Sequence, residues 1–145
     1  MIYFDNSATT QTAPEVAEII NHYMLLNYAN PSSLHIAGQS VHADLARARR
    51  DIAAYLNCHP KELIFMASGT EADNFALIQG ARMRRDRGRH IITSAVEHKA
   101  VLKSCEFLER EGYEVSYLPV DETGRVSIDD LKAAVREDTI LVSLI

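Results

Sequence analysis

Four short apolar runs alternate with helical patterns in the second half of the chain, and this alternation most constrains the fold. The runs are short enough for strands, and the segments between them have the spacing of helices. The predicted strands are Leu63–Ala67, Ile91–Ala95, Val115–Val120 and Thr139–Ile145, and the predicted helices are Thr70–Arg85, Lys99–Glu111 and Ile128–Val135. We therefore predict an α/β fold with a mostly parallel sheet covered by helices on both faces.

The first half of the chain is predicted to be helical after an irregular start. Residues 1–12 show no regular pattern, and Pro14 opens a helix that runs to about Leu26. A loop rich in Asn, Pro and Ser then leads to a longer helix, about Ile36–Leu56, with apolar residues spaced four and three apart. We expect an N-terminal segment over residues 1–12 and one domain portion over residues 13–145.

Composition places the chain among ordinary globular proteins. Hydrophobic residues make up 47%, charged residues 24%, and the net charge is −5, so nothing calls for a nucleic-acid partner. The basic stretch over residues 82–89 lies at a predicted helix C-terminus, where positive charge is favourable; a nucleic-acid or lipid patch is the less favoured alternative. The sequence shows no membrane-length apolar run and no signal peptide, so we expect a cytoplasmic protein without membrane contact.

Cysteines and histidines give no metal or disulfide pattern. Cys58 and Cys105 form neither a disulfide framework nor a ligand spacing, and Cys105 is expected to be a small packing residue. The histidines also lack the spacing of metal ligands. Besides His98, His35 in NPSSLH is the one other histidine considered for a functional role. We therefore predict no metal site.

The junction between the first predicted strand and its helix reads SGTE over residues 68–71. Thr70 can cap the helix, and Asp73 three residues on completes a capping-box pattern, which is the structural interpretation. The functional interpretation uses the same geometry, because a helix N-terminus after a strand offers free backbone N–H groups to a phosphate. The stretch matches neither a P-loop nor GxGxxG, so the pattern alone leaves both interpretations open.

His98 is the second candidate site residue. It follows the second predicted strand and opens the next helix. Ligands of open α/β sheets gather at the carboxyl ends of strands, so we expect His98 and Thr70 to lie in one crevice. A helix N-terminus disfavours the imidazolium, and a neutral ring can stack on an aromatic ligand. A histidine that merely starts a helix is the alternative.

Six segments form a recognisable series: YFDNSATT (3–10), NPSSLH (30–35), ELIFMASGTEADN (62–74), HIITSAVEHKAVL (90–102), GYEVSYLPVDETGRV (112–126) and DTILVSLI (138–145). In these segments the chain resembles the cysteine desulfurases, class V aminotransferase-like enzymes of the fold type I pyridoxal-phosphate group. The segments run in family order and cover nearly the whole chain. The resemblance implies that residues 13–145 are the N-terminal part of the large domain, which binds pyridoxal phosphate.

The resemblance implies roles for three residues. The family's Gly/Ala–Thr pair binds the cofactor phosphate through backbone N–H groups and the Thr hydroxyl, and it falls on Gly69 and Thr70. The family's histidine stacks over the pyridine ring and assists proton transfer, and it falls on His98. Where the family usually reads Thr-Ser-Gly-Gly/Ala-Thr-Glu, this chain reads MASGTE over residues 66–71. The small residues differ, but the backbone donors are kept.

The implied reaction removes sulfur from L-cysteine. Pyridoxal phosphate acts as an electron sink, and a cysteine thiolate attacks the substrate sulfur to give a protein persulfide and L-alanine. An acceptor such as an iron–sulfur scaffold protein would take the sulfur, and the family is usually homodimeric. The family's Schiff-base lysine, substrate-binding arginine and nucleophilic cysteine follow Ile145, and Lys99, Cys58 and Cys105 do not match them. The 145 residues alone are therefore expected to be inactive.

Two other interpretations stay open beside the desulfurases and the closely related selenocysteine lyases. The chain can be a non-catalytic truncated or split paralogue that acts as an interaction piece. The second alternative is an unrelated α/β phosphate-binding domain, which would require the segment matches to be accidental.

The resemblance also implies a strand order in which, of the four predicted strands, only the second and third are neighbours. The isolated chain would then expose apolar strand edges, which promote aggregation. We expect low solubility and no cooperative thermal transition for the isolated chain when circular dichroism is recorded. A cooperative melt from a highly soluble monomer would contradict this expectation.

Overall fold

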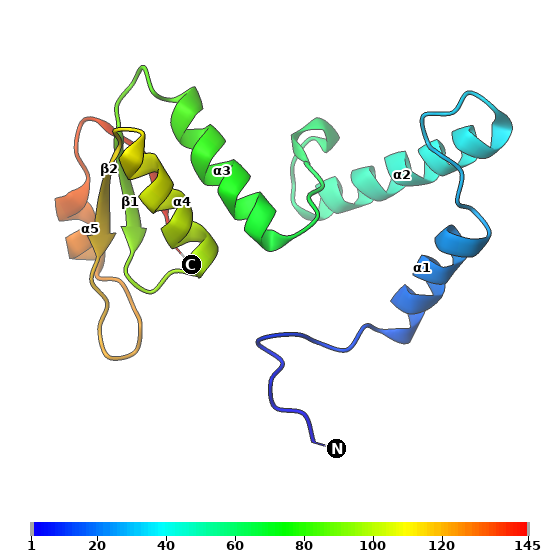
Figure 1. Ribbon diagram of the computed structural model, residues 1–145, viewed down its shortest axis with the longest axis horizontal. Coiled ribbons are helices and arrows are strands. Elements are labelled where there is room, and N and C mark those ends of the chain that lie inside the picture. Colours follow the sequence, from blue (N-terminus) through cyan, green and yellow to red (C-terminus); the bar gives the residue numbers. More distant parts are fainter. Residues whose placement is uncertain (1, 145) are drawn as a thin grey trace. The chain divides into compact units, whose positions relative to one another are not determined.

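The computed structural model describes residues 2–144, which form two compact units divided between Ile64 and Phe65 (Figure 1). The first unit holds two α-helices and one turn of 3-10 helix: α1 (Pro14–Leu25), α2 (Ile36–Tyr55) and η1 (Pro60–Glu62). Both helices lie where the sequence predicted them, and residues 2–13 contain no helix or strand. No helix in the described part of the chain is long and apolar enough to cross a membrane.

The loop before α2 is fixed by a histidine cap and a glycine contact. Nδ1 of His35 accepts a hydrogen bond from the backbone N–H of Gly38 at 3.2 Å. A Cβ on Gly38 would lie 2.4 Å from the carbonyl oxygen of Ser33, so the loop can pack this closely only against glycine. His35 therefore serves the start of α2, which accounts for its place in NPSSLH.

The second unit is a three-stranded parallel sheet with helices on both faces. Its elements are α3 (Gly69–Met83), β1 (His90–Ser94), α4 (Lys99–Arg110), β2 (Glu114–Leu118), α5 (Ile128–Ala134) and β3 (Thr139–Ser143). The strand order is β2-β1-β3, and both pairings are parallel. Right-handed crossovers in opposite directions put α4 and α5 on opposite faces, as Figure 1 shows. The predicted α/β class and the helices are confirmed.

Two predictions about strands are wrong. The run Leu63–Ala67 is not a strand: it is irregular backbone between η1 and α3, and Ile64 is 58% exposed. A strand needs a neighbour to satisfy its backbone groups, and no strand lies beside this run within residues 2–144. The predicted order was also wrong, because β1 pairs with β3 as well as with β2. β1 is thus the central strand.

The core of the second unit forms between β1 and the two helices α3 and α4. All five residues of β1 are buried, as expected for a central parallel strand. Ile91 packs with Ala81 of α3 and with Leu108 and Tyr113 of the α4–β2 region. The connection into β1 passes so close to β3 that a Cβ on Gly88 would lie 2.2 Å from the carbonyl oxygen of Asp138. This contact requires glycine at the entrance to the central strand.

His90 joins all three strands at the amino end of the sheet. Its Nδ1 lies 2.7 Å from Oγ1 of Thr139 on β3, and its Nε2 lies 2.8 Å from Oγ of Ser116 on β2. The side chain is buried, and this burial lowers the pKa of His90, with Arg136 adding to the shift and Asp138 and Glu114 opposing it. The folded protein therefore holds this imidazole neutral, with both ring nitrogens used between strands.

Stability is expected to fall as the pH drops below the histidine pKa of unfolded chains, about 6.5. The unfolded chain binds a proton at His90 that the folded chain resists, so the stabilisation is full above pH 6.5 and is lost below it. Urea unfolding of the full-length protein, as wild type and as His90→Gln, at pH 7.5 and pH 5.5 measures this. The wild-type free energy of unfolding should decrease more steeply than that of the variant. Equal pH dependence would show that His90 does not contribute.

Candidate functional site

Helices α3 and α4 both begin at the edge of the sheet where the strands end. α3 precedes β1 and α4 follows it, and each runs opposite to the strand (Figure 1). The buried hydroxyl of Ser104 donates to Oδ1 of Asn74 at 2.6 Å and joins the two helices. Asn74 lies five residues after Gly69, and Ser104 lies five residues after Lys99. The first turns of the two helices are therefore level with each other.

The N-terminus of α3 is capped by a different residue from the one predicted. The hydroxyl of Ser68 accepts a hydrogen bond from the N–H of Glu71 at 3.2 Å, and the Glu71 carboxylate accepts one from the N–H of Ala67 at 2.7 Å. The prediction that Thr70 caps the helix with Asp73 is wrong. Ser68 has the extended backbone that an N-cap requires, with φ −158° and ψ 162°, so Thr70 lies inside the first turn.

Two backbone N–H groups at the start of α3 have no acceptor within residues 2–144. They belong to Gly69 and Thr70, which are exposed, whereas Ser68 accepts from the N–H groups of Glu71 and Ala72. A Cβ on Gly69 would meet nothing within 4 Å, so the space beside these donors is open. Free N–H groups at the positive end of a helix suit an anion, and phosphate above all.

His98 is the N-cap of α4. Its Nδ1 accepts a hydrogen bond from the N–H of Ala100 at 3.1 Å, and the residue is exposed. Because Nδ1 is the acceptor, the proton of the neutral ring is assigned to Nε2, which is left available to a ligand. The structure thus brings His98 and the free amides of Gly69 and Thr70 to the same edge of the sheet, on neighbouring helices.

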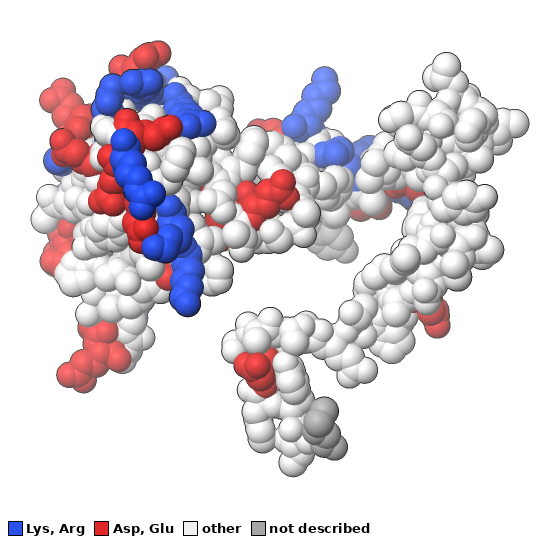
Figure 2. Space-filling view, in the orientation of Figure 1, with Lys and Arg blue, Asp and Glu red and all other residues white. Residues whose placement is uncertain are grey.

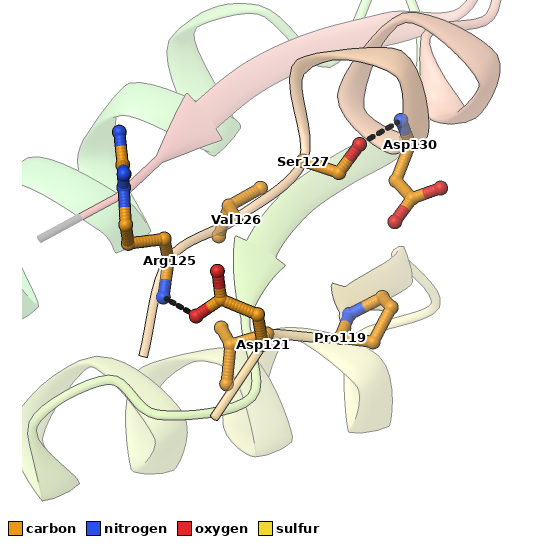
Figure 3. Close-up of a pocket in the computed structure, with 7 residues that line it drawn as sticks. Pro119, Asp121, Arg125, Val126, Ser127 and Asp130 are labelled. Carbon is orange, nitrogen blue, oxygen red and sulfur yellow. Dashed lines mark hydrogen bonds between the residues drawn. The ribbon is translucent and has the colours of Figure 1, made fainter. Parts of the chain in front are cut away.

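A hollow of about 400 Å³ also lies beyond the carboxyl end of β2, and several of the polar groups that line it are hydrogen-bonded within the loop (Figure 3). The Asp121 carboxylate accepts from the N–H and hydroxyl of Thr123 and from the N–H of Arg125, and these bonds lower the pKa of Asp121. The hydroxyl of Ser127 accepts from the N–H of Asp130. These contacts account for the turn DETG over residues 121–124, and we do not assign the hollow a ligand.

The basic stretch at the end of α3 is largely engaged with groups of the same unit. The guanidinium of Arg82 makes a two-pronged contact with the carboxylate of Glu111, with Nη2 distances of 2.9 and 2.8 Å. Arg84 donates to the carbonyl oxygen of Gly80 at 3.3 Å, near the helix C-terminus. Basic and acidic side chains interleave on this face (Figure 2). The contacts favour the predicted solvated helix end over a nucleic-acid patch.

No cluster of metal-ligating side chains occurs in the part of the chain that the structure describes. Cys105 is fully buried in a core cluster with Leu77 and Val101. Burial raises the pKa of its thiol to about 11, and the carboxylates of Glu109 and Glu97 add to the shift. The prediction that Cys105 is a packing residue is confirmed.

The fold and this edge define an α/β protein with two free backbone amides at a helix N-terminus, on the same edge as an exposed histidine. The family model of aminotransferase class V matches residues 2–145, and the chain belongs to this family. Cysteine desulfurase IscS of Methanosarcina thermophila is 47% identical over 143 residues, which are 99% of this chain but 35% of that protein. The chain therefore spans about a third of this relative. Enzymes of this family depend on pyridoxal phosphate.

Solved structures give the same result. A NifS-like protein superposes with a TM-score of 0.94 at 38% identity, covering 99% of this chain and 39% of that one. A structure described as SspA in complex with cysteine superposes with a TM-score of 0.88 at 36% identity, covering 98% of this chain and 41% of that one.

The thiols should differ sharply in reactivity. We expect Ellman's reagent at pH 8 to modify Cys58, which is partly exposed, and to leave Cys105 unmodified until the protein unfolds, because burial raises the Cys105 pKa to about 11. Mass spectrometry of the labelled full-length protein, before and after denaturation, locates the modified thiols. In a Cys58→Ser control, Cys105 should stay unmodified until unfolding; rapid modification of Cys105 in the folded variant would contradict the buried assignment.

Proposed function

We propose that the protein is a pyridoxal-phosphate-dependent cysteine desulfurase and that this chain supplies the phosphate donors and the histidine of the cofactor site. The observation that carries the proposal is the pair of free N–H groups at Gly69 and Thr70, level with the exposed ring of His98. The 47% identity to a cysteine desulfurase and the likeness to a cysteine complex support the substrate and the reaction.

The first turn of α3 fits a phosphate group. Gly69 and Thr70 present two amides at the positive end of the helix, and the side chain of Thr70 adds a hydroxyl on the exposed surface. Glycine at position 69 leaves the space beside these donors free of any side chain. A dianionic phosphate placed there would gain charge-assisted hydrogen bonds without displacing a protein group.

His98 would act on the aromatic part of the cofactor and on a proton. Pyridoxal phosphate, when bound, supplies an electron sink for the bonds broken at the substrate's α-carbon. The N–H of Ala100 engages Nδ1, so the ring keeps one orientation and presents Nε2–H as a hydrogen-bond donor; the ring would take up a proton at Nδ1, giving up the bond from Ala100. The flat ring can stack on a pyridine ring that is anchored by its phosphate at α3.

The remaining features of the proposal concern the whole protein. We propose L-cysteine as substrate, with a sulfur acceptor such as an iron–sulfur scaffold protein as partner, in a cytoplasmic homodimer. Residues 13–145 would belong to the large domain that binds the cofactor. The test incubates the purified full-length protein with pyridoxal phosphate, L-cysteine and a thiol reductant. Stoichiometric L-alanine and sulfide are expected, and their absence with a loaded cofactor would overturn the proposal.

Replacing Thr70 should weaken cofactor binding. Thr70→Val keeps the size of the side chain and removes the hydroxyl, and one hydrogen bond to a charged group contributes about 1.5–3 kcal/mol, or roughly tenfold to hundredfold in affinity. Equilibrium dialysis with absorbance of the bound cofactor measures the change. Thr123→Val, an exposed threonine in the DETG turn, is the control and should bind the cofactor normally. Equal affinities for both variants would argue against Thr70 as a phosphate ligand.

A further inference from the structure

We propose that Ser94 and Glu97 form a buried hydrogen-bonded pair that positions His98. Both are positioning residues, because they are buried and act on His98 through the backbone of the turn between β1 and α4. The orientation of His98 follows from the structure of this chain alone, whereas the expected effect on turnover rests on the proposed function.

The pair is buried at the carboxyl end of the central strand. The hydroxyl of Ser94 donates to Oε1 of Glu97 at 2.8 Å, and the two residues are 2% and 7% exposed. Glutamate is almost never buried to this degree unless its carboxylate has partners. The carboxylate therefore holds a defined place under the turn, and Ser94, as part of β1, ties that place to the sheet.

The turn that follows β1 is held at successive points. The N–H of Ala95 donates to the carbonyl oxygen of Leu118 at 3.0 Å, which continues the pairing of β1 with β2. Glu97 is tied to Ser94, and the next residue, His98, is the N-cap of α4. The backbone between the end of β1 and His98 is thus held in place ahead of the first turn of α4.

The ring of His98 has little else to orient it. It is exposed, and its hydrogen bond within residues 2–144 is the one from Ala100 N–H to Nδ1. That bond forms only when the N-cap residue has its non-helical backbone, here φ −58° and ψ 147°. If the Ser94–Glu97 bond is lost, the turn gains freedom, and the Nδ1 bond that selects the Nε2–H form of the ring weakens.

The test uses the full-length protein loaded with pyridoxal phosphate and labelled with ¹⁵N at histidine. Ser94→Ala removes the donor, and Ser94→Thr keeps a hydroxyl as the conservative rescue. Ser116→Ala is the matched control, since Ser116 also makes a side-chain hydrogen bond of 2.8 Å, to His90 at the other end of β1. The His98 signals, assigned with His98→Gln, report the protonated nitrogen, and steady-state kinetics report kcat and KM separately.

We expect Ser94→Ala to move the His98 ¹⁵N shifts toward an average of the two tautomers and to lower kcat about tenfold with KM unchanged, because the proton-transferring group is less well oriented. Ser94→Thr should restore both readouts. Ser116→Ala should lower the melting temperature without moving either. Unchanged His98 shifts in Ser94→Ala, or equal changes in Ser116→Ala, would overturn the proposal. Responsive shifts in a protein without desulfurase activity would instead refute the proposed function and leave the pair standing.

Discussion

The parallel pairing of β1 with strands on both of its sides is the constraint on which the second unit depends. Two parallel neighbours cannot be joined to β1 by tight turns, so the chain must cross the sheet in helices each time. The crossover helix α4 runs back along β1, and α3, which leads into β1, also runs opposite to it, so both helices begin at one edge of the sheet. The free amides of Gly69 and Thr70 and the ring of His98 share a location because both helices run opposite to the central strand.

The site depends more on backbone than on side-chain identity. The groups at the start of α3 that are free to meet an anion are backbone amides, and the helix is capped by the hydroxyl of Ser68. This explains how the MASGTE segment can rearrange its small residues relative to the family pattern and still present the donors. The same holds at α4, where His98 is held by an amide of its own helix.

The sequence predicted the helices well because their signals are local, as with Pro14 at the start of α1 and the apolar spacing of α2. It failed where the answer depended on distant residues. The run at Leu63–Ala67 has the composition of a strand but no partner strand, and composition does not report partners. Ser68 and Thr70 are both good capping residues, and only the backbone conformation decides between them. The pairing of Asn74 with Ser104 and the burial of Glu97 carry no sequence signal of their own.

His90 also bears on the order in which the sheet assembles. Its hydrogen bond to Ser116 closes a segment of 26 residues, whereas its bond to Thr139 closes one of 49. Chain entropy penalises the longer closure by about 0.6 kcal/mol for each doubling of length, which favours the β1–β2 pair as the earlier event. On this argument β3 would dock second, against an edge whose entrance, at Gly88, has no side chain in the way. The two hydrogen bonds of His90 thus join the central strand to one partner near it in sequence and to another farther along the chain.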